Sequence, residues 1–209
     1  MSFMSFMSFM IRFGFFTMMG CAPFSSMPPP AHFASDRSSE IGVIGGGGFS
    51  YDVPEMYSPD TAIFSQGYAY RQLSKKHSVG LKVQYGTLMN DMPSGGVFYR
   101  YTFHNDKQSY RGFDVDVGLL YVKSSYTTAW RQKSSQVYIS PSVAFNLLGD
   151  IFAPDLTLPV GYTLWLGKEY ALNMEIGGLG YSHPSGNVAS FDWDIQLGMY
   201  AAFGLSTRF

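Results

Sequence analysis

SFDWDIQLGMYAAFGLSTRF, residues 190–209, is the stretch that decides the fold, because its side chains alternate in character over almost its whole length. Every odd position from Phe191 to Phe209 is apolar or small except Thr207, whereas the even positions are mostly polar or small. This period of two predicts a strand with one apolar and one polar face. A mean soluble strand has only about 5–6 residues, and a membrane strand needs about 9–11 to cross. The stretch therefore favours a membrane-crossing strand over a strand of a soluble sandwich.

The same alternation recurs along the chain and gives nine candidate strands. Their ranges are 41–49, 61–73, 79–86, 97–103, 113–121, 137–147, 156–166, 170–176 and 191–209. The first is the weakest because of its glycine run at 45–48, and Pro141 and Pro159 predict bulges in two others. Bacterial barrels have an even number of strands. We therefore expect an all-β, transmembrane, antiparallel up-and-down β-barrel with eight strands, the first lying outside. Ten strands is the alternative, if one long segment hides a turn.

Composition agrees with a barrel and excludes several other classes of protein. Only 14% of the 209 residues are charged, against roughly 25% in soluble domains. The formal net charge of −1 indicates neither a nucleic-acid-binding surface nor an acidic tail. After the first twenty residues, no stretch approaches the ~20 apolar residues of a transmembrane helix. Tyr and Trp near the expected strand ends predict interfacial girdles: Tyr51, Tyr57, Tyr110, Tyr121, Tyr126, Trp130, Trp165, Tyr170 and Tyr181.

The amino-terminal residues read as a targeting segment followed by a tether. Residues 1–20 are largely apolar and predict a signal segment, with Met4, Met7 and Met10 as alternative starts. Gly20-Cys21 resembles the lipobox of bacterial lipoproteins, although Met18-Met19 departs from the usual residues; the resemblance implies lipidation of Cys21. An ordinary signal peptide with an incidental Cys is the alternative. Residues 21–40 are rich in Pro, Ser and Ala and predict a flexible tether, so that 41–209 form the barrel.

If the apolar faces meet lipid, the charged side chains of the strands point into the lumen. The inward set is expected to be Arg71, Lys82, Arg100, Asp114, Asp116, Glu175, Asp192 and Asp194. The interior of so small a barrel is nearly filled by side chains. Unpaired charges are costly there, so pairing is the default. We expect basic and acidic walls to face each other in an ion-pair network that plugs the lumen.

Two groups of residues suggest an enzyme, and in each case a structural interpretation is favoured. Asp114/Asp116 and Asp192/Asp194 are loosely similar to the acidic pairs of the omptin surface proteases, but no His lies beside either pair. Residues 183–187, HPSGN, resemble the His/Ser/Asn groupings of outer-membrane deacylases and phospholipases, but their Pro and Gly predict a turn. No metal-ligand spacing or nucleotide-binding motif occurs. We therefore expect no catalytic activity, metal or cofactor.

Phe209 resembles the terminal aromatic signature of outer-membrane barrels, which the family's insertion machinery recognises. Residues 41–209 resemble small outer-membrane barrels of the OmpA/opacity-protein type. The resemblance implies a bacterial outer-membrane location, with lipid and the insertion machinery as partners and no nucleic acid. The expected role is structural or surface interaction around a charge-plugged lumen. A narrow porin-like channel for small solutes is the alternative, and a membrane-embedded hydrolase is the second alternative.

Overall fold

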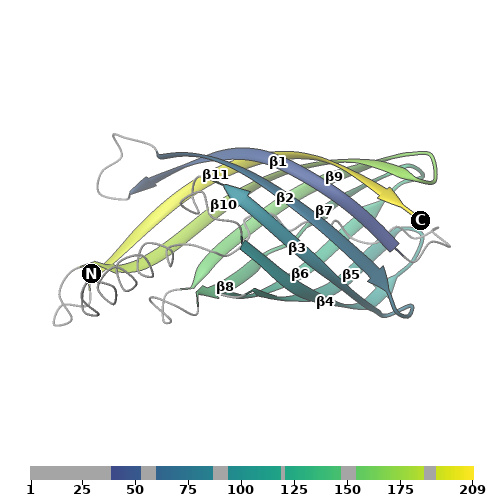
Figure 1. Ribbon diagram of the computed structural model, residues 1–209, viewed down its shortest axis with the longest axis horizontal. Coiled ribbons are helices and arrows are strands. Elements are labelled where there is room, and N and C mark those ends of the chain that lie inside the picture. The colour runs from purple at the N-terminus through teal and green to yellow at the C-terminus, as the bar shows by residue number, and fades with distance from the viewer. Residues whose placement is uncertain (1–38, 53–59, 87–93, 119–120, 147–153, 186–191) are drawn as a thin grey trace, which may run out of the picture.

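The computed structural model of the chain describes residues 39–52, 60–86, 94–118, 121–146, 154–185 and 192–209. These residues form eleven strands in one antiparallel sheet (Figure 1). The strands are β1 (Ser39–Asp52), β2 (Asp60–Gln72), β3 (His77–Gly86), β4 (Ser94–Asn105), β5 (Ser109–Gly118), β6 (Tyr121–Arg131), β7 (Ser135–Ile139), β8 (Ser142–Asn146), β9 (Asp155–Leu166), β10 (Tyr170–Ser185) and β11 (Asp192–Arg208). Because β11 pairs with both β10 and β1, the sheet closes into a barrel. A helix long and apolar enough to cross a membrane does not occur in these ranges.

The barrel wall has ten strand positions, because β7 and β8 follow one another between the same neighbours, β6 and β9. The main prediction of eight strands is therefore wrong, and the alternative of ten is correct. The sequence pattern missed β6, whose outward face mixes Val122 and Tyr126 with Ser124 and Thr128 and so lacks a clean apolar stripe. The expected strand 113–121 ran across the boundary between β5 and β6.

The glycine-rich strand β1 is one of the strands of the barrel wall, not a strand outside it as expected. It is hydrogen-bonded to β11 on one side and to β2 on the other. Its glycines permit a close approach: a Cβ on Gly46 would collide with the Ala201 carbonyl, the Phe64 ring and Ala202. β1 also begins at Ser39, so that Ser39 and Glu40, which we assigned to the tether, belong to the barrel.

The two prolines within expected strands behave differently. The ladder breaks at Ser140-Pro141, between β7 and β8. Pro159 remains in β9, whose register with β10 is unbroken, so the bulge predicted there is wrong on that side. On its other side, the Pro159 carbonyl accepts a hydrogen bond from the Ser140 backbone N–H, at the point where β9 changes partner from β8 to β7. The two prolines thus lie at one irregular place in the wall.

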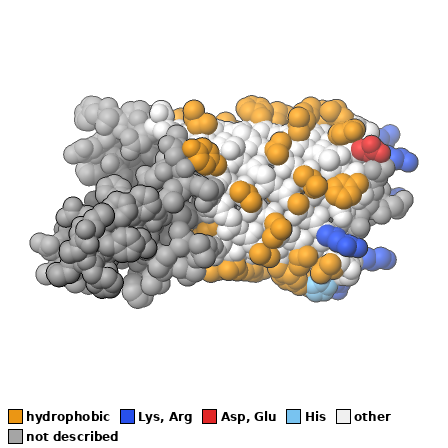
Figure 2. Space-filling model, viewed as in Figure 1, with side chains coloured by type: hydrophobic (Ala, Val, Ile, Leu, Met, Phe, Trp, Pro, Cys, Tyr) orange, Lys and Arg blue, Asp and Glu red, His pale blue; other side chains and the backbone are white. Residues whose placement is uncertain are grey.

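The outward face is apolar, and Figure 2 shows hydrophobic side chains distributed over one side of it. In β11 the outward residues are the predicted ones, including Leu197, Met199, Phe203 and Leu205, each more than half exposed. β2 is the exception to the prediction. Its aromatic face, which was expected to point outward, is buried inside the barrel, and its outward face carries mostly small residues, together with Ile63 and Arg71.

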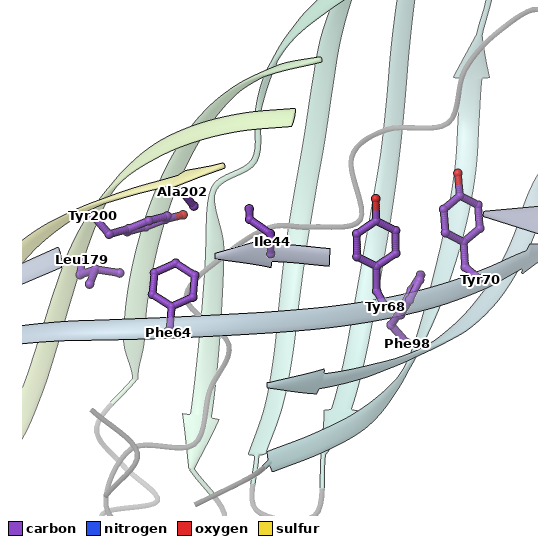
Figure 3. Packing of buried hydrophobic residues seen from close by; sticks show 8 residues of the cluster. All are labelled: Ile44, Phe64, Tyr68, Tyr70, Phe98, Leu179, Tyr200 and Ala202. Atoms are coloured by element: carbon purple, nitrogen blue, oxygen red, sulfur yellow. The ribbon is translucent and has the colours of Figure 1, made fainter. Parts of the chain in front are cut away.

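The inward aromatic rings fill space that inward glycines leave open. Tyr68 lies opposite Gly42 and Tyr138 lies opposite Gly161, and a Cβ on either glycine would collide with the ring. Large and small inward residues thus alternate, as in other small barrels. The main buried apolar cluster appears in Figure 3: Ile44, Phe64, Tyr68, Tyr70, Phe98, Leu179, Tyr200 and Ala202. Packing of the rings over the glycines explains why the aromatic face of β2 turns inward.

Candidate functional site: the charged barrel interior

The barrel interior holds equal numbers of acidic and basic side chains among the residues that the structure describes. The five buried basic residues are Lys82, Arg100, Lys123, Arg131 and Arg208, and the five buried acidic residues are Glu40, Asp114, Asp116, Asp155 and Glu175. All ten are less than a tenth exposed. A buried charge is stable only when it is paired and hydrogen-bonded, so the balance of charge within the wall is a requirement of the fold.

Two ion pairs link the early strands. Arg100 in β4 lies directly opposite Asp114 in β5, and its Nε and Nη2 donate to the two carboxylate oxygens at 2.8 and 2.9 Å. Such a two-point contact is the strongest geometry for an arginine–carboxylate pair. The Lys82 Nζ atom reaches across the Phe98 ring to donate to Asp116 Oδ2 at 2.8 Å, and the Tyr121 hydroxyl donates to Asp116 Oδ1.

A third ion pair closes the barrel between its first and last strands. Glu40 in β1 and Arg208 in β11 occupy paired positions in the ladder, and Arg208 Nε donates to Glu40 Oε2 at 2.6 Å. The hydroxyls of Tyr68 and Tyr70, both in β2, donate to the two Glu40 oxygens at 2.9 and 3.0 Å. Glu40 therefore joins three strands around the seam, and it is almost fully buried.

Glu175 forms a further centre in β10, which pairs with β11 on the side away from β1. Its two carboxylate oxygens accept hydrogen bonds from the Tyr138 and Tyr200 hydroxyls at 2.8 and 2.7 Å. Near the barrel end, Arg131 donates to the Asn105 side chain, the Asp106 carbonyl and the Gln136 side chain. The interior polar groups thus form hydrogen-bonded centres that link strands one or two positions apart in the wall, rather than two walls of opposite charge.

The structure places the predicted lumen residues as follows. It brings together Lys82 with Asp116 and Arg100 with Asp114, and it buries Glu175 with two tyrosines. Arg71 is exposed on the outer face, so its predicted lumen position is wrong. The error follows from the reversal of β2, since Arg71 lies on the opposite face from Tyr70. The side chains of Asp192 and Asp194 lie outside the described part of the chain, although both residues belong to β11.

Three other predictions concern residues near or beyond the described ranges. Cys21 and residues 1–38 lie outside them. Residues 183–185 belong to β10 and pair with β11, so the turn predicted there is wrong at these positions. Phe209 is 60% exposed on the outer face. Its backbone exchanges hydrogen bonds with Ser39, which fastens the last residue to the first strand.

Sequence reasoning missed five interior charges: Glu40, Lys123, Arg131, Asp155 and Arg208. Arg208 has a clear signal, because it is at an even position of the alternating last strand. Lys123 and Arg131 belong to the undetected strand β6. Glu40 and Asp155 lie just before the first residues of two expected strands, in places where the pattern had not yet begun.

The described interior shows no cluster of metal-ligating side chains. Groups of three or more His, Cys, Asp or Glu side chains placed to hold a metal ion are absent from the described ranges. The side chains of His77 and His104 are not in the interior: His77 packs against Tyr99 and Tyr101, and His104 contacts Asp106 at the barrel end. The interior contacts described above are ion pairs and hydrogen bonds that neutralise or satisfy the buried charges.

The exposed charges gather at one end of the barrel, where Ser39, Phe209 and the four tight turns at 73–76, 106–108, 132–134 and 167–169 lie. We call this end the tight-turn end; Figure 2 shows its Lys and Arg side chains on the right. Each turn accepts a backbone hydrogen bond from the strand beyond its own hairpin, as in Thr102 N–H to the Lys76 carbonyl. In one turn, the Ser109 and Gln108 N–H groups donate to Asp106 and lower its pKa to about 2. Asp106 thus stays ionised at neutral pH.

Together these features define a closed, ten-position antiparallel barrel with an apolar outer wall and a charge-balanced interior. Neither a protein-family model nor a curated protein sequence matches the chain. Among solved structures, it is similar to the outer membrane protease OmpT of Escherichia coli, with 9% identity over 86% of this chain and 99% of that one, at a TM-score of 0.48. It is also similar to an outer membrane channel of Pseudomonas putida F1, with 11% identity over 88% and 100%, at 0.47. Neisserial surface protein A shows 10% identity over 82% and 97%, at 0.42.

Proposed function

We propose that this chain is a bacterial outer-membrane barrel embedded in lipid, with a structural or surface-interaction role and a lumen closed by its own charges. One observation carries the proposal. Wherever the structure describes a charged side chain, that side chain lies inside the barrel or at the tight-turn end. The rest of the outer wall carries exposed aliphatic and aromatic residues. Their exposure is unfavourable in water and favourable in the hydrocarbon of a membrane.

The two ends of the barrel support an orientation in the membrane. Outer-membrane barrels have short turns on the periplasmic side and longer loops outside. At the tight-turn end each described connection has three or four residues, whereas four of the five connections at the other end span six to eight. Exposed Trp130 and Tyr170 begin an aromatic belt at the tight-turn end, which continues through Tyr99 and Phe103. We assign this end to the periplasm, with Phe209 as the insertion signal there.

Three residues of the predicted girdle point inward instead. Tyr110, Tyr121 and Trp165 are all buried in the barrel, although each lies near a strand end. In the interior, the Tyr121 hydroxyl donates to Asp116, and the Arg208 guanidinium lies over the Trp165 ring at 5.6 Å. Proximity to a strand end therefore does not decide the face, which depends on the parity of the position.

Conductance in a planar bilayer tests the closed lumen. We expect the inserted wild-type barrel to give no steady openings, because ten buried charges and the aromatic cluster occupy its interior. Replacing Arg100 and Asp114 together by Ala removes the side chains of one ion pair and should produce small openings. Steady wild-type openings that change in ion selectivity with Asp114→Asn would contradict the closed lumen.

A narrow channel remains the second candidate, and one observation favours it. The side-chain oxygens of Thr163 and Asn173 are buried, lie opposite one another on β9 and β10, and have no hydrogen-bond partner. Buried polar atoms of this kind are ordinarily satisfied by water. A file of water along these two strands would be the start of a conducting path, and the bilayer measurement distinguishes the two functions.

A further inference from the structure

The outer wall is hollowed over β1 to β4, close to the tight-turn end. This groove has a volume of about 370 Å³ and is open along its outer side. Its outward-facing lining is apolar except at Ser39 and at one charged side chain, that of Arg71. The groove therefore combines a surface for hydrocarbon with a fixed positive charge.

The strand register explains the hollow. Ile41, Ala69 and Leu81 are directly paired across β1, β2 and β3, and all three point outward. Ala69 is the smallest of the three, so that it forms the floor of a channel between two longer side chains, which are 46% and 59% exposed. The width of this channel is set by the pairing of β1 with β2 and β3, which holds the two walls apart.

Arg71 lies at the mouth of the groove, in the row next to Ala69 on the side of the tight turn. It is flanked in the ladder by Ser39 and Val79, neither of which is acidic. Lys75 and Lys76 follow in the adjacent turn, and both are exposed. The carboxylate that lines the groove, Glu40, points into the barrel and is bound by Arg208 and two tyrosines. The mouth therefore carries three cationic side chains and, among the described residues, no exposed acidic side chain.

The whole tight-turn end has the same sign. Its exposed cations are Arg71, Lys75, Lys76, Lys107, Arg111, Lys133 and Lys168. The exposed acidic side chains at this end are two, Asp106 and Glu169. A ring of positive charge beside an apolar wall attracts anionic lipid headgroups, and a guanidinium binds phosphate oxygens through paired hydrogen bonds.

We propose that this groove is a binding site for one anionic glycerophospholipid, with an acyl chain along Ala69 and the phosphate at Arg71. The proposal rests on the membrane function proposed above, because the groove faces hydrocarbon only when the barrel is embedded. The acyl chain fills the channel between Ile41 and Leu81. The phosphate diester accepts hydrogen bonds from Arg71, and Lys75 and Lys76 add to the attraction. The site selects for headgroup charge, and an uncharged or zwitterionic headgroup gains less from it.

Native mass spectrometry of the full-length, folded protein in mild detergent tests the site. Dioleoyl phosphatidylglycerol is the probe, and dioleoyl phosphatidylcholine is the zwitterionic comparison. We expect wild type to retain one phosphatidylglycerol in preference to phosphatidylcholine. Arg71→Gln should weaken that binding about tenfold, which corresponds to the loss of one charge-assisted contact. Ala69→Leu should weaken it similarly by filling the channel without changing the charge.

Lys133→Gln is the matched control, because it removes one charge from a turn on the far side of the rim from the groove. It should leave the affinity within about twofold, the change expected for a screened exposed charge. Equal losses in Arg71→Gln and Lys133→Gln would overturn the groove in favour of a diffuse rim effect. Equal binding of phosphatidylglycerol and phosphatidylcholine would also overturn the proposed site. Unchanged binding in both Arg71→Gln and Ala69→Leu would do the same. A sample that migrates identically in gels with and without boiling would instead contradict the barrel itself.

Discussion

Replacing Glu40 by Ala is expected to destabilise the barrel by about 3–5 kcal/mol, the usual cost of removing one partner of a buried ion pair. Arg208 would lose its carboxylate, and the hydroxyls of Tyr68 and Tyr70 would lose their acceptor. The effect should be large because all these groups lie at the seam where the first and last strands meet. The measurement is urea-induced unfolding of the protein refolded into lipid vesicles, followed by tryptophan fluorescence.

A double variant separates the ion pair from simple loss of packing. Glu40→Leu with Arg208→Met removes both charges and keeps apolar volume, so its destabilisation should be clearly smaller than that of Glu40→Ala. Glu169→Ala, at an exposed turn position, should change the free energy of unfolding by no more than about 0.5 kcal/mol. A loss below about 0.5 kcal/mol for Glu40→Ala would show that the seam does not depend on this carboxylate.

Phe203→Arg is expected to cost about 2–4 kcal/mol, the penalty for an arginine on the lipid face near the bilayer midplane. Phe203 is 65% exposed on the outer wall. With a rise of ~3.3 Å per residue and a tilt of ~40°, it lies about 15 Å along the barrel axis from the end at Phe209. That is close to half of the ~25 Å apolar band.

The matched variant is Leu73→Arg, which places the same charge in the tight turn after β2. Leu73 is 61% exposed, almost as exposed as Phe203, but it lies beyond the end of the strand. Its substitution should cost about 0–1 kcal/mol, as for an interfacial position. Both values come from unfolding in vesicles. Equal costs at the two positions would mean that the wall does not face a layer of hydrocarbon whose polarity varies with depth.

The fold was predictable where the two faces of a strand differ in polarity. In β11, the alternation assigned every described outward residue correctly, and the even position of Arg208 indicated its inward side chain, although the predicted lumen set omitted it. In β2 both faces are uncharged over most of their length, and burial of the rings over glycines on neighbouring strands decided the orientation. That decision depends on contacts between strands, which alternation within a single strand does not encode.

The interior site was only partly predictable for the same reason. Asp114 and Asp116 stand out because they alternate with Phe113, Val115 and Val117. The partner of each depends on the register, which places Arg100 directly opposite Asp114 but leaves Lys82 to reach Asp116 from two strands away. Glu40 is linked to Arg208 across 168 residues of sequence, so that only closure of the barrel brings them together.

The most direct test of the account is gel migration of the full-length protein extracted from membranes, with and without boiling. A closed barrel with ion pairs at its seam and between its strands should remain folded in cold detergent and migrate differently from the boiled chain. We predict such a shift for the wild type, with the unboiled band lost at lower temperature in Glu40→Ala. Identical migration of boiled and unboiled wild-type protein would contradict the lipid-embedded barrel.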